Sequence, residues 1–549
     1  MKKLAFIFAL LVISVSCKNE KKQSEDSSTD VSDISTKEFT EFKVEDSKYI
    51  NLENLWAPFN KEFNTFTDSD YNSIYPFVYD QDIPTIQKHI IDGNLTYEKL
   101  VKFYLYRIKK YDRFNKKSLN SVIALNPNVI NEAKARDENI QKRSNKDGLE
   151  HSVYGIPILL KDNINAKGMP TTAGAAVLLN NNTEDAFIVK SLKEKGALIL
   201  GKANLSEWAY FFCGDCPSGY SAVGGQTFNP YGKKKFDTGG SSSGSAVAVA
   251  ANFCAAAIGS ETSGSILSPS GQNSAVGLKP TIGLVSRSGI IPISSTLDTA
   301  GPITKNVIDN AILLDAIFGY DTKDLKSVDR NVSKSYYTTI QADGNLNGKR
   351  FGVFKSLISD ELYTLAIQNL KRLGVEIVEV DDPEVNLPDF LRLLNLDMKK
   401  DLPAYLKAYA HQDVQIITVE DVIDYNNEDL EKRAPYGQKL FKGIVDDKAS
   451  EEEFNSIKNV LHTNGKLYFD KPFEEYKLDA ILSINNYHAG YAAVAEYPAI
   501  IVPMGYTEKS EPKGLTFIAK PFQEKELLYW ALEYENISKA RQAPTLYEQ

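Results

Sequence analysis

The sequence of 549 residues has only four cysteines and five histidines. So few cysteines exclude a scaffold built from disulfides, and so few of both types argue against a Cys/His-rich metal protein. The apolar run Leu4–Val15 is too short to cross a bilayer as a stable helix, and the composition excludes a polytopic membrane protein. Basic residues show no excess, because 63 Lys and Arg stand against 72 Asp and Glu. The resulting net charge of -9 argues against a general nucleic-acid binder.

The composition is that of a globular chain. Hydrophobic residues make up 42% and charged residues 25%, so a large core can be buried. At about 150 residues per domain, length alone would give three or four domains. The patterns along the chain instead predict a signal peptide at 1–16, a disordered tether at 17–50 and one domain at 51–549.

The N-terminus has the pattern of an export signal. Lys2 and Lys3 precede an apolar run whose length suits a signal-peptide core. Ser14-Val15-Ser16-Cys17 then resembles the lipobox of bacterial lipoproteins, in which the cysteine is lipidated; ordinary secretion with an unrelated cysteine is the alternative. Residues 18–50 are rich in Ser, Asp, Glu and Lys, which is typical of a disordered segment. We therefore expect an exported bacterial lipoprotein, anchored to a membrane through Cys17 on the periplasmic side or the cell surface.

Helical and strand-like patterns alternate in the first half of the domain. Thr96 is expected to cap a helix with Leu100 and Tyr104 on its apolar stripe, and a helix at 185–195 is expected to stop at Gly196. Buried strands are expected at 121–125, 156–160, 197–200, 479–484 and 499–502. This alternation predicts an α/β architecture with a largely buried sheet.

Residues 239–302 are unusually rich in Gly, Ser and Ala. Such a stretch is often a flexible linker, but Ala246–Ile258 continues it as a dense apolar run. We expect a buried helix of small residues here, with Cys254 as a buried thiol. Residues from about 320 to 470 show ordinary helices and charged loops, and no pattern there indicates chemistry.

Common catalytic motifs are missing, since the chain has no G-x-S-x-G, H-E-x-x-H or G-x-x-x-x-G-K-[ST] pattern. Two Gly/Ser turns remain, at 239–245 and 259–266, together with Lys161 after an apolar strand. Such turns can supply a hydroxyl nucleophile and free amide groups. Burial would lower the pKa of Lys161 toward neutrality, so that its amine could act as a base. The alternative is a surface lysine and two plain glycine turns.

These residues form a recognisable pattern. The pattern consists of the turn Gly239-Gly240-Ser241-Ser242-Ser243-Gly244, a second turn Gly264-Ser265-Ile266, and the upstream Lys161. Ser265 follows Ser241 by 24 residues. Together these features resemble the amidase signature family. Further matches occur at 154–157, 202–208, 277–281, 298–302, 497–499 and 502–505, so the resemblance covers roughly 85–320 and 475–540. It implies the amidase signature fold, a single large α/β domain with a central mixed β-sheet covered by helices on both faces.

The resemblance also implies roles for individual residues. Ser265 would be the acyl-accepting nucleophile, Ser241 the bridging serine in a cis Gly240–Ser241 peptide, and Lys161 the neutral base. Water would hydrolyse the acyl-enzyme, and neither a metal nor an organic cofactor is needed. The oxyanion hole would consist of the backbone amides of Thr262, Ser263, Gly264 and Ser265.

Two departures from the family pattern bear on the substrate. Members that act on small acidic amides carry an arginine shortly after the nucleophile, whereas Ile266-Leu267-Ser268-Pro269 contains no cation. Glu261-Thr262-Ser263 stands where Asp-x-Gly is common. Glu-Thr-x-Gly-Ser-Ile, like Gly283–Arg287, resembles the peptide amidase branch, which hydrolyses the C-terminal amide of peptides. The resemblance therefore implies a peptide or other uncharged amide as substrate.

An aromatic segment with two cysteines follows the match at 202–208. In the family this neighbourhood borders the substrate pocket, so Trp208, Tyr210 and Phe212 could line it, although core packing explains them equally well. Cys213 and Cys216 are spaced for a local disulfide after export, whereas a thioredoxin-like or zinc site would need different surroundings. His488 is compatible with a pocket wall or with a structural role.

Three functions compete. The first is a lipid-anchored serine amidohydrolase that converts a small-molecule or peptide carboxamide to a carboxylate and ammonia. The second is the amidotransferase subunit that serves glutaminyl-tRNA formation, which the export signal argues against because that reaction is cytoplasmic. The third is a non-catalytic binding lipoprotein on the same fold, which the intact Lys161, Ser241 and Ser265 argue against.

Overall fold

The computed structural model describes residues 42–143, 145–330, 335–340 and 345–548. The predicted signal peptide, Cys17 and the tether up to residue 41 lie outside these residues. Residues 42–50, which the sequence assigns to the tether, lie against the domain. Asp46 pairs with Gly225 in a β-bridge, and the buried Ser47 hydroxyl donates a hydrogen bond to the carbonyl of Val223. The packed part of the chain therefore begins before residue 51.

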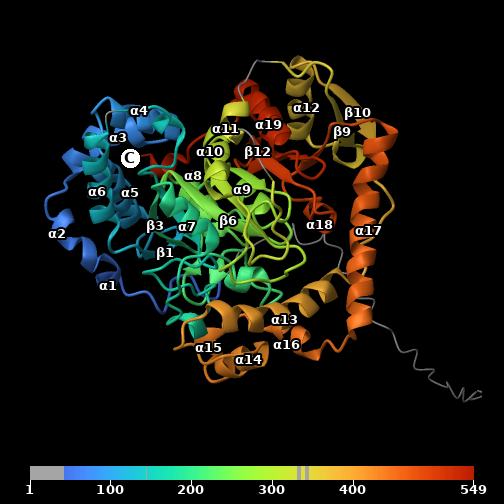
Figure 1. Ribbon diagram of the computed structural model, residues 1–549, viewed down its shortest axis with the longest axis horizontal. Coiled ribbons are helices and arrows are strands. Elements are labelled where there is room, and N and C mark those ends of the chain that lie inside the picture. The colour runs from blue at the N-terminus through green and yellow to red at the C-terminus, as the bar shows by residue number, and fades with distance from the viewer. Residues whose placement is uncertain (1–41, 144, 331–334, 341–344, 549) are drawn as a thin grey trace, which may run out of the picture. The chain divides into compact units, whose positions relative to one another are not determined.

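A mixed sheet runs through the domain (Figure 1). β2 is parallel to both neighbours, β3 and β6, and β9 is parallel to β11 and β10, whereas the other neighbouring pairs are antiparallel. A separate short pair consists of β4 (Tyr220–Ser221) and β5 (Gly225–Gln226). In sheet order the strands are β1 (Val122–Leu125), β3 (Leu198–Ala203), β2 (Pro157–Lys161), β6 (Ala256–Glu261), β8 (Thr299–Thr304), β7 (Val276–Lys279), β12 (Ala499–Tyr506), β13 (Pro512–Ile518), β11 (Ala480–Ile484), β9 (Arg350–Phe354) and β10 (Glu376–Val380).

Helices form three groups along the chain (Figure 1). Before and beside β1 come α1 (Leu52–Trp56), α2 (Asn60–Phe63), α3 (Asp68–Val78), α4 (Ile83–Ile91), α5 (Tyr97–Tyr111) and α6 (Val129–Lys142). Those between and around the strands are α7 (Phe187–Glu194), α8 (Ser243–Ala250), α9 (Leu267–Gln272), α10 (Val307–Ile317), α11 (Tyr336–Thr339), α12 (Glu361–Arg372), α18 (Ala489–Val494) and α19 (Glu524–Ser538). The inserted group is α13 (Phe390–Tyr409), α14 (Val419–Asn427), α15 (Leu430–Arg433), α16 (Lys439–Asp446) and α17 (Glu451–Glu475). None of the helices within the described ranges is both long and apolar enough to cross a membrane.

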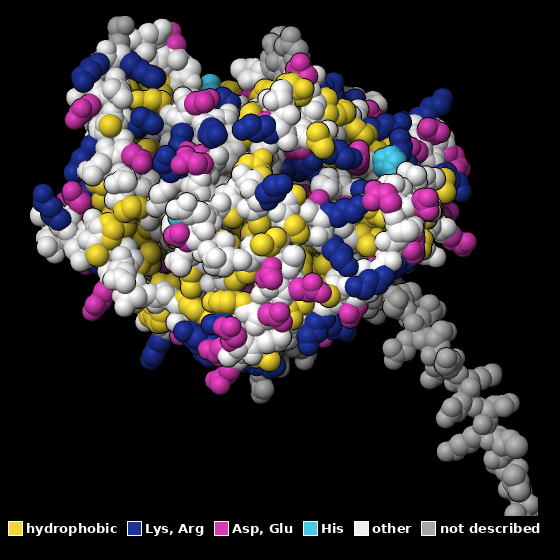
Figure 2. Space-filling view, turned by 60° about the horizontal axis from the view of Figure 1, so that its bottom comes forward, with side chains coloured by type: hydrophobic (Ala, Val, Ile, Leu, Met, Phe, Trp, Pro, Cys, Tyr) yellow, Lys and Arg dark blue, Asp and Glu magenta, His cyan; other side chains and the backbone are white. Residues whose placement is uncertain are grey.

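Helices cover both faces of the sheet, as the resemblance implies. Successive side chains of a strand point to opposite faces, and β12 separates them in this way. Ile500 and Val502 share an apolar cluster with Trp530 of α19, whereas Ile501 packs in a second cluster with Leu267 of α9. On the face of the molecule shown in Figure 2, charged side chains of both signs are interspersed.

Local sequence signals at two helix ends are confirmed. The Thr96 side chain caps α5 by accepting a hydrogen bond from the amide of Lys99. Gly196 follows α7 with a φ of +86°, and a Cβ at this position would lie 2.3 Å from the ring of Tyr154. Only glycine meets both requirements without strain. The five expected strands correspond to β1, β2, β3, β11 and β12, with ends shifted by a few residues.

The small-residue stretch is not one helix, so that prediction is wrong. α8 ends at Ala250, Asn252 turns the chain with a φ of +58°, and β6 begins at Ala256. Cys254 is buried as expected, but it lies in the turn. A run that is apolar on every side has no period that separates a helix from a strand.

Residues 320–470 do more than form helices and charged loops, because they also supply β9 and β10. β10 is the last strand of the sheet, with Glu376 and Glu379 exposed and Val380 buried. Edge strands often carry charged side chains, which disfavour pairing with the strand of another molecule. Such a strand resembles a polar loop in sequence.

Candidate active site

Lys161 ends β2 and is fully buried. Its Nζ donates hydrogen bonds to the hydroxyls of Ser241 and Ser260, at 2.7 and 2.9 Å, and to the carbonyl of Ser260 at 3.0 Å. Burial lowers the pKa of Lys161 to about 7, although the nearby Asp298 and Glu261 act in the opposite direction. A substantial fraction of this amine is therefore neutral near pH 7, as a general base requires.

The turn that carries Ser241 is fixed against the end of β6. The Gly240–Ser241 peptide is cis, as the resemblance implies. The amide of Ser206 donates to the carbonyl of Ser241 at 3.0 Å. The Ser242 hydroxyl donates to the carbonyl of Ser260 and accepts from its amide, at 3.0 and 3.2 Å. These bonds hold the Ser241 hydroxyl over Lys161.

Ser265 lies in the turn between β6 and α9 and is 8% exposed. The amide of Ser242 donates to the Ser265 carbonyl at 3.2 Å, so the two serine turns are directly joined. Among the described residues the Ser265 hydroxyl has no hydrogen-bond partner, and the amides of residues 262–265 have no acceptor. A free hydroxyl beside a row of free amide groups is the arrangement that nucleophilic attack on a carbonyl needs.

Glu261 shapes this turn. Its Oε2 accepts hydrogen bonds from the amides of Ile266 and Leu267, at 2.7 and 3.0 Å, and thereby ties the start of α9 back to the end of β6. Gly264 has a φ of +83°, and a Cβ there would lie 2.9 Å from Nδ2 of Asn486. The turn therefore requires a side-chain acceptor at 261 and a glycine at 264.

Replacing Glu261 by alanine is expected to leave the amides of Ile266 and Leu267 unpaired. Each lost bond costs about 1–3 kcal/mol, so the free energy of unfolding should fall by about 2–6 kcal/mol. Urea denaturation of the native protein, Glu261→Ala and Glu261→Gln tests this. Glu261→Gln is the control, because glutamine keeps an acceptor oxygen. Equal stability of the alanine variant and the native protein would contradict the assigned role.

Three further polar residues complete the site, and sequence reasoning gave them no role. The Thr262 hydroxyl donates to Oδ1 of Asp298 at 2.5 Å, and the amides of Ile293 and Ser294 donate to Oδ2 at 2.8 and 2.9 Å. Nδ2 of Asn163 donates to the Ser260 hydroxyl at 2.9 Å. Asp298 begins a segment that matches the family pattern and Ser260 lies in the 259–266 turn, which were the available signals, whereas the part played by Asn163 becomes visible only in three dimensions.

A cavity of about 300 Å³ opens beside this cluster. Asn163, Ser260 and Thr262 line its inner end, and apolar side chains of the 290–293 segment and of α13 line much of the rest. Pockets of this size accommodate small ligands. The lining includes Ser260, which is bonded to Lys161, and Thr262, three residues before Ser265, but not Lys161, Ser241 or Ser265 themselves. The cavity therefore offers space for a ligand beside this cluster.

Trp208, Tyr210 and Phe212 do not belong to the lining of this cavity. Trp208 and Phe212 are buried, and both pack against Phe441 of α16 with ring centroids 5.3 and 5.1 Å apart. The Tyr210 hydroxyl donates to the carbonyl of Cys216 at 2.9 Å. These contacts favour the core-packing interpretation, and the neighbour Ala209 is the residue of this segment that reaches the cavity.

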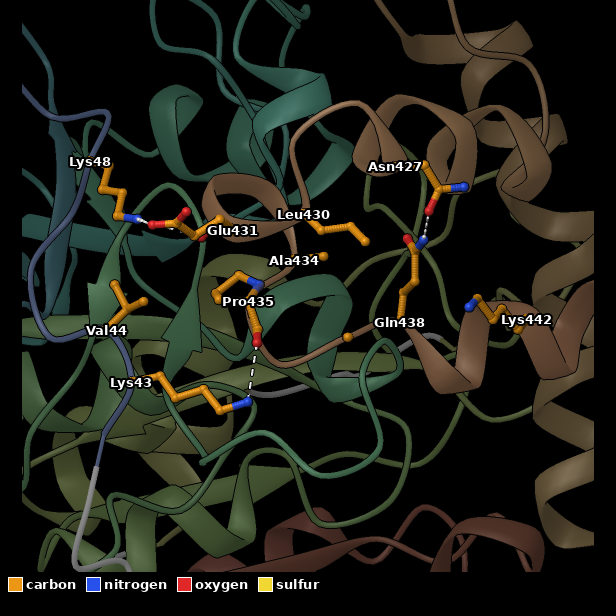
Figure 3. A pocket seen from close by; sticks show the side chains of 11 residues that line it. Lys43, Val44, Lys48, Asn427, Leu430, Glu431, Ala434, Pro435, Gln438 and Lys442 are labelled. Atoms are coloured by element: carbon orange, nitrogen blue, oxygen red, sulfur yellow. Dashed lines mark hydrogen bonds and ion pairs between the residues drawn. The ribbon is translucent and has the colours of Figure 1, made fainter.

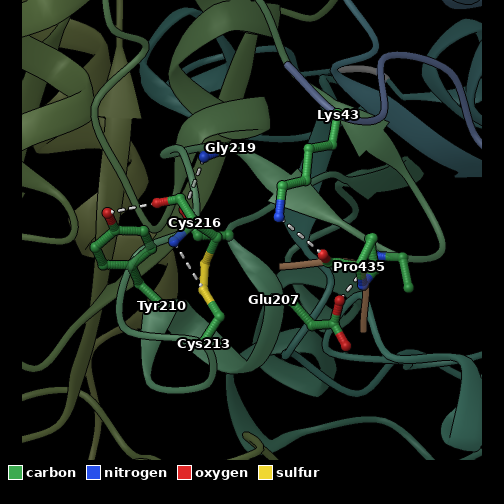
Figure 4. Close-up of a disulfide and its surroundings, with 9 residues drawn as sticks. Lys43, Glu207, Tyr210, Cys213, Cys216, Gly219 and Pro435 are labelled. Carbon is green, nitrogen blue, oxygen red and sulfur yellow. Dashed lines mark hydrogen bonds between the residues drawn. A yellow bond between two sulfur atoms is a disulfide. The ribbon is translucent and has the colours of Figure 1, made fainter. Parts of the chain in front are cut away.

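Cys213 and Cys216 form a disulfide (Figure 4). Their Cα atoms are 5.8 Å apart, a usual separation for a disulfide. The carbonyl of Phe212 accepts the amides of Leu440 and Phe441, so the bridged loop is attached to the start of α16. The bridge thus braces the loop under the inserted helices.

His488 is buried and packs against aromatic rings. Its ring lies 4.5 Å from that of Phe354, and Nδ1 shares a 2.6 Å hydrogen bond with the Ser483 hydroxyl. Burial lowers the pKa of His488 to about 4, so the ring is neutral at pH 7. These contacts favour the structural role, and His488 does not line the cavity beside Ser260.

A second cavity, of about 540 Å³, lies between residues 43–48 and the segment 427–442 (Figure 3). Lys43 Nζ donates to the carbonyl of Pro435, and Lys48 Nζ to that of Glu431, at 3.3 and 3.4 Å. The residues that line it include no side-chain hydrogen-bond partner of Lys161, whereas the first cavity is lined by Ser260, to which Lys161 Nζ donates hydrogen bonds. The candidate site is therefore the cavity at Ser260 and Thr262.

Comparison with known proteins agrees with this geometry. The family model described as Amidase matches residues 99–434. The chain belongs to the amidase family. It is 38% identical over 469 residues to a "Probable amidase" of Arabidopsis thaliana, covering 82% of this chain and 89% of that one. The crystal structure of native peptide amidase from Stenotrophomonas maltophilia superposes with a TM-score of 0.80 at 35% identity, covering 86% of this chain and 99% of that one.

Another relative carries a different activity in its name. A glutamyl-tRNA(Gln) amidotransferase subunit of Thermoanaerobacter pseudethanolicus is 31% identical over 488 residues, which cover 81% of this chain and 94% of that one. Relatives of this chain thus carry names for more than one activity.

Proposed function

We propose that this amidase is a serine amidohydrolase that converts an uncharged carboxamide, such as a peptide amide, to a carboxylate and ammonia. The observation that carries the proposal is the 2.7 Å hydrogen bond between Lys161 Nζ and Ser241 Oγ, in a site where burial has lowered the pKa of Lys161 to about 7. Similarity to the Stenotrophomonas maltophilia peptide amidase supports the substrate class.

In the proposed reaction the neutral amine of Lys161 accepts the proton of Ser241, and Ser241 accepts the proton of Ser265. Ser265 Oγ then bonds to the amide carbon, and the amides of residues 262–265 stabilise the negative oxygen. The carbon–nitrogen bond breaks, and the proton returns through Ser241 so that ammonia leaves. Water attacks the acyl group on Ser265 by the same proton route and releases the carboxylate.

An ammonia-release assay tests the function. The panel contains peptide amides, aryl amides, fatty amides and glutamine, with release recorded for each at equal enzyme concentration. We expect turnover of peptide amides. Turnover of glutamine alone would favour the amidotransferase alternative, which the similarity to the Thermoanaerobacter pseudethanolicus protein supports. Binding without turnover of any amide would favour the binding-protein alternative.

We also propose that the protein is exported and anchored through a lipid on Cys17. The support is the sequence Ser14-Val15-Ser16-Cys17 after a short apolar run that follows Lys2 and Lys3. Metabolic labelling with a fatty acid should mark the native protein and leave Cys17→Ala unlabelled. Equal labelling of both would refute the anchor.

A further inference from the structure

The cavity beside Ser260 and Thr262 contains one carboxylate whose capacity to accept hydrogen bonds is largely unused. Asp298 is engaged through both oxygens, as described above, and Asp324 accepts from the guanidinium of Arg287 through both of its oxygens. Within the described part of the chain, Asp401 accepts hydrogen bonds only from Ser295, whose amide donates to Oδ2. A carboxylate has about four acceptor positions, so Asp401 can still accept from a ligand.

The cations of the cavity do not neutralise Asp401 by a direct contact. Arg287 forms its ion pair with Asp324 and donates from Nη1 to the carbonyl of Ser295 at 2.6 Å. Lys323 is exposed on the loop at the cavity rim. An anionic substrate would meet the Asp401 carboxylate without a free guanidinium to compensate for it.

Asp401 also occupies one end of an apolar wall. Ala404, Tyr405, Ala408 and Tyr409 follow it on α13 at spacings that place all of them on one helix face, and all line the cavity. The Tyr405 hydroxyl donates to Oδ1 of Asn165 at 2.6 Å, which fixes the ring. An apolar stem ending in a cation, as in lysine or arginine, matches such a surface.

We propose that Asp401 selects carboxamides whose acyl part ends in a protonated amine or a guanidinium on an apolar stem, such as amides of basic residues. This inference rests on the amidase function proposed above. It keeps peptide amides as the substrate class but replaces the uncharged acyl part proposed there with one that carries a positive charge. Asp401 would act as a specificity residue and would take no part in the bond-breaking steps.

Matched substrates test the proposal. Values of kcat/KM are measured for N-acetyl-lysinamide, N-acetyl-argininamide and N-acetyl-norleucinamide, the last having a similar stem and no charge. The native enzyme should prefer the two cationic amides by about tenfold or more, as expected for a charge pair in a partly desolvated site. Asp401→Asn, which keeps an acceptor for the Ser295 amide, should reduce that preference to about twofold and leave norleucinamide turnover within about threefold. Asp424→Asn, an exposed site on α14, is the control and should retain the preference.

The pH dependence provides a second measurement. Burial raises the pKa of Asp401 to about 6, and the negative charges of Asp397 and Asp298 act in the same direction. The cation of Arg287 interacts electrostatically with Asp401. Lys323 and Asp324 line the same cavity. The ratio of lysinamide to norleucinamide kcat/KM should fall below pH 6, where Asp401 becomes protonated. Ionisation of Lys161 affects both substrates equally and cancels in this ratio.

Each outcome decides the proposal. Turnover of norleucinamide without a preference for cationic amides overturns it and leaves the amidase function intact. Equal losses for all three substrates in Asp401→Asn also overturn it, because they indicate a structural role. Absence of turnover for every amide, charged or neutral, contradicts the proposed function itself.

Discussion

Replacing Ser265 by alanine is expected to lower kcat for amide hydrolysis by about 10⁴-fold or more. The substitution removes the one oxygen that is proposed to bond to the acyl carbon and leaves the backbone amides of the turn in place. Because the Ser265 hydroxyl has no hydrogen-bond partner among the described residues, the free energy of unfolding should change little. Ammonia release and urea denaturation together measure both effects.

Ser268→Ala is the matched control for this experiment. Ser268 lies in the first turn of α9, three residues after Ser265, and no catalytic step uses its hydroxyl. Its kcat should stay within about threefold of the native value. Residual activity of a few per cent or more in Ser265→Ala, in the absence of native enzyme, would mean that another group attacks the amide.

Replacing Lys161 by methionine is expected to lower kcat/KM by about 10³-fold, the usual contribution of a general base. Methionine preserves most of the buried stem and removes only the amine. The Ser241 hydroxyl would then lose its proton acceptor. A circular dichroism spectrum of the variant separates loss of the base from loss of the fold.

The pH profile of the native enzyme identifies the same group. Burial lowers the pKa of Lys161 to about 7, and only the neutral amine can accept a proton. The value of kcat/KM should therefore rise as the pH increases through about 7 and then level off, until another group titrates. Lys161→Arg should be as inactive as the methionine variant, since a guanidinium stays protonated throughout this range. If the residual activity of Lys161→Met rose through pH 7 as the native activity does, the ionisation would belong to another residue.

The residues proposed to be catalytic could be selected from the sequence because the proposed chemistry constrains them locally. Lys161, Ser241 and Ser265 each lie where a buried element meets a turn, and the spacing of their motifs follows from the packing of β2, α8 and β6. The end of α7 and the cap of α5 were predictable for a similar reason, since Gly196 and Thr96 act on residues adjacent in sequence.

What was not predictable depends on contacts between distant segments. The stretch from α8 to β6 is apolar throughout, so no period indicated where the helix ends. Trp208 and Phe212 are aromatic residues of the kind that line pockets. In the structure they pack against Phe441 of α16, a contact between distant segments that the sequence does not reveal. Asp401 belongs to a segment without a recognisable motif, and it reaches the cavity because α13 lies across the site.

The central claim is that Ser265 is the acylated residue, and covalent labelling tests it most directly. The folded, active enzyme is treated with a fluorophosphonate, and the adduct is located by mass mapping of peptides. The account predicts one adduct, on Ser265, formed in parallel with loss of amide hydrolysis and absent from Ser265→Ala. An enzyme that hydrolyses amides and carries its inhibiting adduct on any other residue would contradict it.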